Sequence, residues 1–187
     1  MLRIARCRWT PRLTVHARHI SNYYRLFPET LPDGPPPKGK FDVDVKQLRN
    51  EYLRAQRQAH PDVAGGDSQV NSAELSSAFR VLRDPIARAE HILTLKGANP
   101  LEEGAGTLED EDLLMDIMMS REFVSEAESK DELEPIIAQT NEKLASLERA
   151  VGDALEKDDV ETAQKKLIEL TYVAKLQQAA DQKKEEL

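Results

Sequence analysis

The chain has few aromatic residues, few glycines and almost no cysteine. Of its 187 residues, 5% are aromatic, 8 are glycine, and Cys7 is the only cysteine. No stretch alternates apolar and polar residues with a period of two, and no apolar run is long enough to span a membrane. These absences predict a soluble, globular, all-α protein with no membrane partner. The formal charge of −8 argues against nucleic-acid binding in general, since phosphate contacts need a basic face.

The N-terminal segment contains no acidic residue before Glu29 but six arginines: Arg3, Arg6, Arg8, Arg12, Arg18 and Arg25. This pattern is typical of a mitochondrial transit peptide, whose positive charge favours uptake along a membrane potential. The stretch from Arg18 to Ser21 resembles a site that a matrix peptidase cuts after Ile20. The sequence therefore predicts a transit peptide over 1–20 and a mature protein in the mitochondrial matrix. The alternative is a disordered basic tail.

Removal of residues 1–20 would take five arginines and Cys7 with it, and the net charge would change from −8 to −13. A mature chain without cysteine has no disulfide and no nucleophilic thiol. It also cannot bind zinc or an iron–sulfur cluster through thiolates of its own. Only two histidines would remain, His60 and His91, which are too few for a convincing metal site. We therefore expect no metal and no cofactor.

The rest of the chain divides into a first half over 21–96, a linker over 97–108 that contains proline and glycine, and an acidic, helix-rich part over 109–187. In the first half, one apolar stripe with helical spacing comprises Val45, Leu48, Tyr52, Ala55 and Ala59. Basic residues lie off this stripe. A second stripe, which Asn71 and Glu74 precede as a capping box, comprises Leu75, Ala78, Phe79 and Leu82. Asp84 and Pro85 then open a third helix that ends near Lys96. The first two helices form a predicted helical hairpin.

The tripeptide His60-Pro61-Asp62 lies where the basic helix of this hairpin ends. It could be a simple turn, in which proline stops the helix and aspartate caps the loop. It could be an acid–base pair of an enzyme, but the sequence offers no nucleophile or pocket around it. The third interpretation is a contact site for another protein, and the basic helix before it and the packing helix after it favour that one.

The last part of the chain predicts a three-helix bundle with an exposed apolar surface. In residues 113–124 the apolar side chains point almost all round the helix, so a small bundle cannot bury all of them. The middle helix has a seam at Ile137, Leu144 and Val151. The last helix has a core stripe that comprises Val160, Ala163, Leu167, Leu170 and Ala174, and a second stripe that comprises Ile168, Tyr172 and Leu176. This second stripe predicts either a binding surface or a helix that is covered on two sides.

Residues 21–96 resemble a J-domain. The matching parts are N-Y-Y-R-L-F-P at 22–28, the basic helix that ends in Q-A-H-P-D, and S-A-E-L-S-S-A-F-R-V-L-R-D-P at 72–85. The C-terminal bundle matches too, and the whole is similar to the iron–sulfur co-chaperone HscB and its mitochondrial counterparts. Animal members carry an additional cysteine-rich segment, which this chain lacks, so it resembles the shorter, fungal-type members.

The resemblance implies that the protein is not an enzyme itself but stimulates the ATPase of a DnaK-type heat-shock chaperone. The chaperone-binding residues that it implies are His60, Pro61 and Asp62, with Arg49, Arg54 and Arg57 steering onto an acidic chaperone face. The alternative for each arginine is simple solubility. The resemblance also implies that the bundle binds an IscU-type scaffold, on which iron–sulfur clusters are assembled. The implied contacts are Leu113, Leu114, Met118, Glu122 and Tyr172. Met118 stands where relatives have leucine, and Met119 stands where they have an acid.

Two other functions remain possible from the sequence. One is a general-folding J-protein that binds unfolded matrix proteins, against which the absence of Gly/Phe-rich and cysteine-rich segments argues. The other is an enzyme that uses His60 as a base, which lacks every supporting residue.

Overall fold

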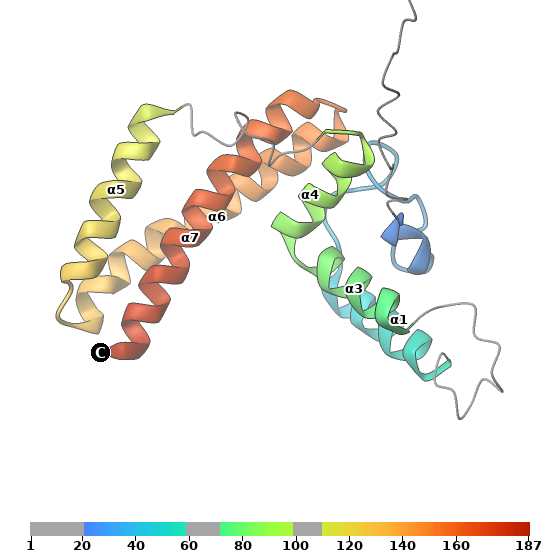
Figure 1. Cartoon of the computed structure of the whole chain (residues 1–187), viewed down its shortest axis with the longest axis horizontal. Helices are drawn as coiled ribbons and strands as arrows, with labels where there is room; N and C mark the ends of the chain where they lie inside the picture. Colours follow the sequence, from blue (N-terminus) through green and yellow to red (C-terminus); the bar gives the residue numbers. More distant parts are fainter. Residues whose placement is uncertain (1–20, 59–71, 99–109) are drawn as a thin grey trace, which may run out of the picture.

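The computed structural model describes residues 21–58, 72–98 and 110–187, and within these ranges every regular element is a helix (Figure 1). The elements are a short 3-10 helix η1 (Tyr23–Leu26), α1 (Val45–Gln58), α3 (Ser72–Arg83), α4 (Pro85–Leu95), α5 (Glu111–Glu126), α6 (Lys130–Glu156) and α7 (Val160–Glu186). The predicted all-α class is confirmed. The proposed transit peptide, His60-Pro61-Asp62 and most of the linker lie outside the described residues.

Aspartate side chains cap the N-termini of four helices, and at α1 Asp44 accepts hydrogen bonds from the backbone N–H groups of Lys46 and Gln47. Asp84 accepts a hydrogen bond from the backbone N–H of Ala87 at 2.9 Å, and Pro85 occupies the first helical position of α4. Asp110 accepts from Leu113 N–H at 2.9 Å at the start of α5. Asp159 accepts from Thr162 N–H at 3.1 Å at the start of α7. The helix start predicted at Asp84-Pro85 is confirmed.

α1 and α3 form the predicted hairpin. Leu48 of α1 is buried, as are Leu75, Ala78 and Leu82 of α3. The rings of Tyr52 and Phe79 stack between the two helices, with their centroids 4.5 Å apart. Val45 does not belong to the buried stripe, because it is the first residue of α1 and stays 45% exposed. The stripe starts one turn later than the sequence predicts.

α6 and α7 pair along their length into a long antiparallel hairpin, and α5 packs against α7 (Figure 1). Along α7, Ala163, Leu167 and Leu170 are buried, whereas Val160 and Ala174 are only half-buried. For Leu176 the second of the two alternatives holds: this residue is covered and belongs to a second core cluster, together with Val124 of α5, Ala127 directly after α5, Leu133 and Ala180. The reason is that the end of α5 covers this side of α7. Ile168 and Tyr172 of the same stripe remain half-buried.

The largest core cluster does not stop at the predicted boundary between the two parts of the chain. It includes Tyr24 and Phe27 at η1 and Ile92 of α4, and it continues through Val151 of α6 and Leu167 of α7. α4 packs directly on α7 and α6. The boundary at 97–108 stays a prediction, but the two parts share one core and are not independent bodies joined by a linker.

Polar contacts reinforce this junction. The backbone N–H of Phe41 donates to Oε1 of Glu156 at 2.8 Å, and the Lys96 ammonium group pairs with Asp158 in the turn between α6 and α7. Arg88 of α4 is buried, and its Nη1 donates to the carbonyl oxygen of Leu82 at 2.7 Å. Burial lowers the pKa of the Arg88 guanidinium, while the nearby Tyr24, Asp42 and Glu148 raise it.

Candidate protein-docking surfaces

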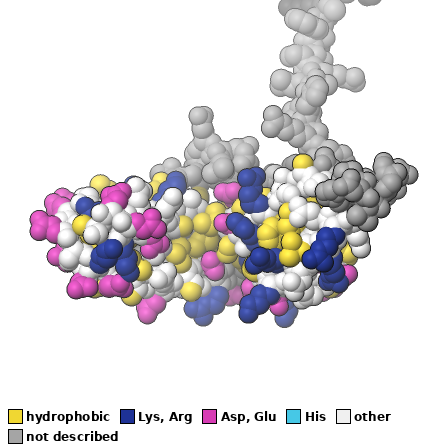
Figure 2. All heavy atoms as spheres, turned by 90° about the horizontal axis from the view of Figure 1, so that it is seen from below, with side chains coloured by type: hydrophobic (Ala, Val, Ile, Leu, Met, Phe, Trp, Pro, Cys, Tyr) yellow, Lys and Arg dark blue, Asp and Glu magenta, His cyan; other side chains and the backbone are white. Residues whose placement is uncertain are grey.

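The outer face of α1 is basic. The helix carries Lys46, Arg49, Arg54 and Arg57, and its only acidic residue, Glu51, is buried on the opposite side. The three arginines predicted to steer toward a chaperone are all exposed. In Figure 2, basic side chains lie around an apolar area over the part of the molecule that carries α1 and α3. The structure therefore provides the face that the sequence predicts, although the tripeptide that follows it lies outside the described residues.

Glu51 fixes the segment that runs beside this face. Its two carboxylate oxygens accept hydrogen bonds from the backbone N–H groups of Glu29 and Thr30, at 3.0 and 2.8 Å. The Glu29 carboxylate in turn pairs with Nη2 of Arg54 at 2.6 Å. Both side chains of this ion pair are more than half exposed, so water and salt screen it. Arg54 is therefore a partly neutralised charge, whereas within the described residues neither Arg49 nor Arg57 forms an ion pair.

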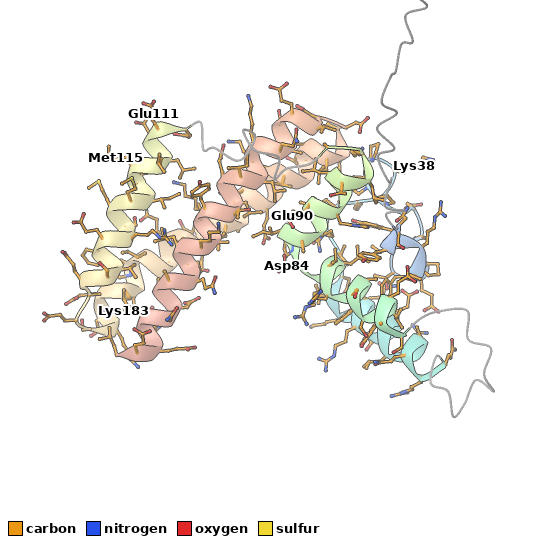
Figure 3. The ribbon with its side chains drawn as sticks, in the orientation of Figure 1. Lys38, Asp84, Glu90, Glu111, Met115 and Lys183 are labelled. Atoms are coloured by element: carbon orange, nitrogen blue, oxygen red, sulfur yellow. The ribbon has the colours of Figure 1, made fainter. Side chains whose placement is uncertain are left out.

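α5 presents an exposed apolar surface on the other part of the molecule. Its inner side comprises Leu113, Ile117 and Val124, which are between 4% and 5% exposed. The methionines Met115, Met118 and Met119 are 61%, 61% and 64% exposed, and Phe123 is 48% exposed. Figure 3 shows Met115 projecting from α5 away from α7. Four of the seven exposed large apolar side chains among the described residues thus belong to one helix.

The predicted scaffold-contact residues differ in how far they are buried. Met118 is exposed, while Leu114 and Tyr172 are half-buried and pack against the main core cluster. The ammonium group of Lys175 lies 5.8 Å from the centre of the Tyr172 ring, so this aromatic has a cationic neighbour. Leu114, Met118 and Tyr172 can form one partly apolar surface, because α5 and α7 are packed side by side.

Leu113 and Glu122 differ from each other. Glu122 is exposed and available to a partner. Leu113 is 5% exposed and belongs to the core cluster, so it supports α5 from beneath and does not line the surface in this structure. The family resemblance implied the same flanking contact role for both residues, and the burial of Leu113 separates them.

Phe123 also contributes to the exposed surface of α5, although the sequence predicted no surface role for this residue. Met115, Met119 and Phe123 are spaced by four residues each and form a stripe along α5. Acidic side chains border this stripe: Glu111, Asp112, Asp116, Glu122 and Glu126 are all exposed. Figure 2 shows acidic side chains gathered on the part of the molecule that carries α5. The spacing of four residues between Met115, Met119 and Phe123 was the sequence pattern that could have predicted this stripe.

The described residues hold no group of three or more acidic, histidine or cysteine side chains that could bind a metal ion. In the same ranges, no helix combines the length and the apolar character that a membrane span requires.

Comparison with known proteins gives consistent matches. A family model described as the HSCB C-terminal oligomerisation domain matches residues 109–181. The J-type co-chaperone jac1, mitochondrial, of Schizosaccharomyces pombe is 41% identical over 125 residues, which are 65% of this chain and 55% of that protein. The chain thus spans about half the length of that relative. The co-chaperone protein HscB homolog of Shewanella halifaxensis is 32% identical over 171 residues, covering 83% of this chain and 92% of that protein.

The iron–sulfur cluster co-chaperone protein HscB homolog of Arabidopsis thaliana is 33% identical over 140 residues, covering 71% of this chain and 55% of that protein. Among solved structures, the Jac1 co-chaperone of Saccharomyces cerevisiae superposes with a TM-score of 0.74 at 27% identity, covering 88% of this chain and 95% of that one. The predicted order of a J-domain hairpin followed by a helical bundle is therefore confirmed.

Proposed function

This mitochondrial chain belongs to the HscB family of J-type co-chaperones, and we propose that it delivers an IscU-type iron–sulfur scaffold to a DnaK-type chaperone of the matrix and stimulates that chaperone's ATPase. ATP hydrolysis then takes place on the partner, and this protein supplies two docking surfaces. The observation that carries the proposal is the pairing of a basic face on α1 with an exposed apolar surface on α5 in one molecule.

The chaperone-docking half of the proposal is supported by charge. α1 carries four exposed basic side chains, and its single carboxylate is buried on the opposite side. The outer face therefore attracts an acidic partner and orients it during encounter. His60, Pro61 and Asp62 follow directly after this helix in the sequence and are proposed to contact the ATPase. Arg54 contributes less than its full charge, because Glu29 already pairs with it.

The scaffold-docking half is supported by exposed apolar area. Large apolar side chains in water favour a partner that buries them, and each such side chain releases about 1.5–3 kcal/mol on full burial. Met118, with Leu114 and Tyr172 beside it, is the proposed centre of the contact, and Glu122 is its proposed polar rim. Leu113 is proposed to act from beneath, by holding α5 in place.

His60→Gln tests the chaperone contact. In this variant, stimulation of the chaperone's ATPase should be lost, while helical content and scaffold binding stay unchanged. Full stimulation by the folded variant would show that the tripeptide is a turn without a docking role.

Alanine at Leu114, Met118 and Tyr172 together tests the scaffold contact. We expect scaffold affinity to fall beyond easy detection, since interface hot spots cost 2 kcal/mol or more each. Leu114 and Tyr172 are half-buried, so the triple variant will also lose some stability. Met118→Ala alone is the matched variant, because its side chain is exposed. Scaffold affinity that survives in a folded triple variant would contradict the proposal. Recovery of a mixture of unfolded proteins in place of the scaffold from matrix extract would favour the general-folding alternative.

A further inference from the structure

The sulfur atoms of the chain are concentrated on one surface. Apart from Met1 and Cys7 near the N-terminus, the sequence holds three sulfur-containing residues, Met115, Met118 and Met119. All three lie on α5, and each is more than 60% exposed. No other methionine or cysteine occurs in the described residues, so their core contains no sulfur that an oxidant could reach by local opening.

The three methionines form one continuous area with the proposed scaffold contact. At about 100° per residue, Met115 lies about 60° from Met118 around the helix, and Met119 lies about 100° from it on the same side. Met118 therefore borders Leu114 in one direction and the stripe of Met115, Met119 and Phe123 in the other. A scaffold that covers Met118 also comes close to both neighbouring sulfur atoms.

We propose that oxidation of Met115, Met118 and Met119 to sulfoxides by a peroxide is a reversible switch that turns off scaffold docking. This inference rests on the proposed function, because it concerns the same surface. The three thioethers are the proposed modification sites, and scaffold binding is the property that their oxidation regulates.

The chemistry requires only a peroxide as oxidant. The lone pair of the methionine sulfur attacks one oxygen of hydrogen peroxide, an S–O bond forms, and the O–O bond breaks. Proton transfer lets the second oxygen leave as water, so the sulfur loses the electron pair that the peroxide gains. A thiol-dependent sulfoxide reductase reverses the step: two thiols become a disulfide, and the oxygen leaves as water.

A sulfoxide changes this surface in two ways. It replaces an apolar thioether with a strong hydrogen-bond acceptor, whose burial costs free energy unless a donor meets it. It also adds its polar group to a helix whose exposed charged residues are mostly acids, such as Asp116 and Glu122, which supply no donor when ionised; Arg121 is the one cation of α5. The core is untouched, because none of the three side chains is buried. Oxidation should therefore abolish docking without unfolding the chain.

The test measures scaffold affinity of the full chain before and after treatment with hydrogen peroxide, with peptide mass mapping to count oxygens at each methionine. The matched variant carries Met115→Leu, Met118→Leu and Met119→Leu, which keep apolar side chains of similar volume and remove the sulfur. Each protein is compared with itself, as the ratio of its affinities before and after oxidation. This variant keeps Met1, Cys7 and Trp9, so it also controls for oxidation elsewhere.

We expect the oxidised wild-type chain to lose at least tenfold in affinity, with its melting temperature unchanged, and to regain affinity after reductase treatment. The ratio for the leucine variant should stay near one. Unchanged affinity of the fully oxidised wild-type chain, or an equal loss in the leucine variant, would overturn the switch. If the untreated chain does not bind the scaffold at all, the proposed function fails first and the switch falls with it. Methyl NMR of labelled methionine adds a direct readout: the three α5 methyl signals should shift when scaffold is added, and unmoved signals in a chain that binds would also overturn it.

Discussion

The guanidinium carbon of Arg88 lies 4.6 Å from the centre of the Phe41 ring, in a cation–π contact at the junction of the two parts of the chain. Arg88 comes from α4 and Phe41 from the segment before α1, and both side chains are buried. The same arginine donates to the carbonyl oxygen of Leu82, so one side chain connects α4, the end of α3 and the segment before α1.

Arg88→Ala should lower the free energy of unfolding by about 3 kcal/mol, because it leaves a cavity and an unpaired carbonyl oxygen at Leu82. Chemical denaturation monitored by circular dichroism measures the change. Arg80→Ala is the control, since Arg80 is exposed, and we expect a change within about 0.5 kcal/mol. Equal effects of the two substitutions would contradict the role of the Arg88 contact.

Gly152 of α6 packs closely against Phe41 at the same junction. A Cβ atom added there would lie 2.9 Å from Cδ1 and 3.3 Å from Cβ of Phe41, and the Cβ of Phe41 cannot move freely. Gly152→Leu should therefore destabilise the fold by about 2 kcal/mol, even though leucine favours a helix by about 0.8 kcal/mol over glycine. Thermal unfolding should show a melting temperature lower by several degrees. A more stable variant would mean that helix propensity outweighs the close packing.

Leu113 and Met118 should respond in opposite ways to truncation. Leu113→Ala removes a core side chain and should cost about 2–5 kcal/mol of stability, whereas Met118→Ala should cost little. Scaffold affinity should fall directly in Met118→Ala. In Leu113→Ala it should fall only at temperatures where α5 loosens, because the proposed role of Leu113 is support. Thermal unfolding beside scaffold titration at two temperatures separates these roles.

The stability of the protein should depend on His91 in mildly acidic solution. His91 stacks on Tyr23 with ring centroids 4.5 Å apart, and its Nε2 accepts from the Tyr23 backbone N–H at 3.4 Å. Burial lowers the pKa of His91 below its ordinary value of 6.5. Below pH 6.5 the unfolded chain therefore binds a proton that the folded chain does not bind. The stability linked to His91 is complete above that pH and is lost as the pH falls toward the pKa of the folded state.

His91→Phe keeps an aromatic ring on Tyr23 but cannot titrate. Its free energy of unfolding should fall less than that of the wild-type chain between about pH 7 and about pH 5. Burial raises the pKa of Glu90 and of Glu148, which stabilises the folded chain as the pH falls. Both groups are present in the two proteins, so the difference between the two curves reports on His91. Parallel curves would show that His91 keeps its ordinary pKa.

The N-terminus of the protein isolated from mitochondria should lie at or near Ser21. The basis is the run of five arginines without an acid over residues 1–20. Sequencing by Edman degradation or N-terminal mass spectrometry measures it. A mature chain that begins at Met1 would contradict the targeting signal and leave a basic tail on the protein.

Local signals explain why most helices could be predicted. Asp84 and Pro85 mark a helix start by chemistry that depends only on adjacent residues, and α4 starts there. Leu75, Ala78 and Leu82 are three and four residues apart, a spacing that places side chains on one side of a helix. All three residues are buried. These features depend on neighbours within a few positions, which the sequence displays directly.

The junction and the sides of α5 could not be predicted, because they depend on partners far away in the sequence. Nothing near Gly152 indicates that Phe41 packs against it, more than one hundred positions away. Likewise, Leu113 and Leu114 are adjacent and chemically identical, yet one is buried and the other half-buried. Only the direction from which α7 approaches decides between them, so the spacing could indicate a surface but could not say where it begins.

α7 runs without a break from the neighbourhood of α4 to that of α5, over Val160–Glu186. An unbroken helix of 27 residues is about 40 Å long and resists bending. It therefore fixes both the distance and the rotation between the elements that pack at its two ends. One residue inserted near its middle would rotate one end against the other by about 100° and lengthen it by about 1.5 Å. The angle between the basic face of α1 and the methionines of α5 therefore depends on the number of residues in α7.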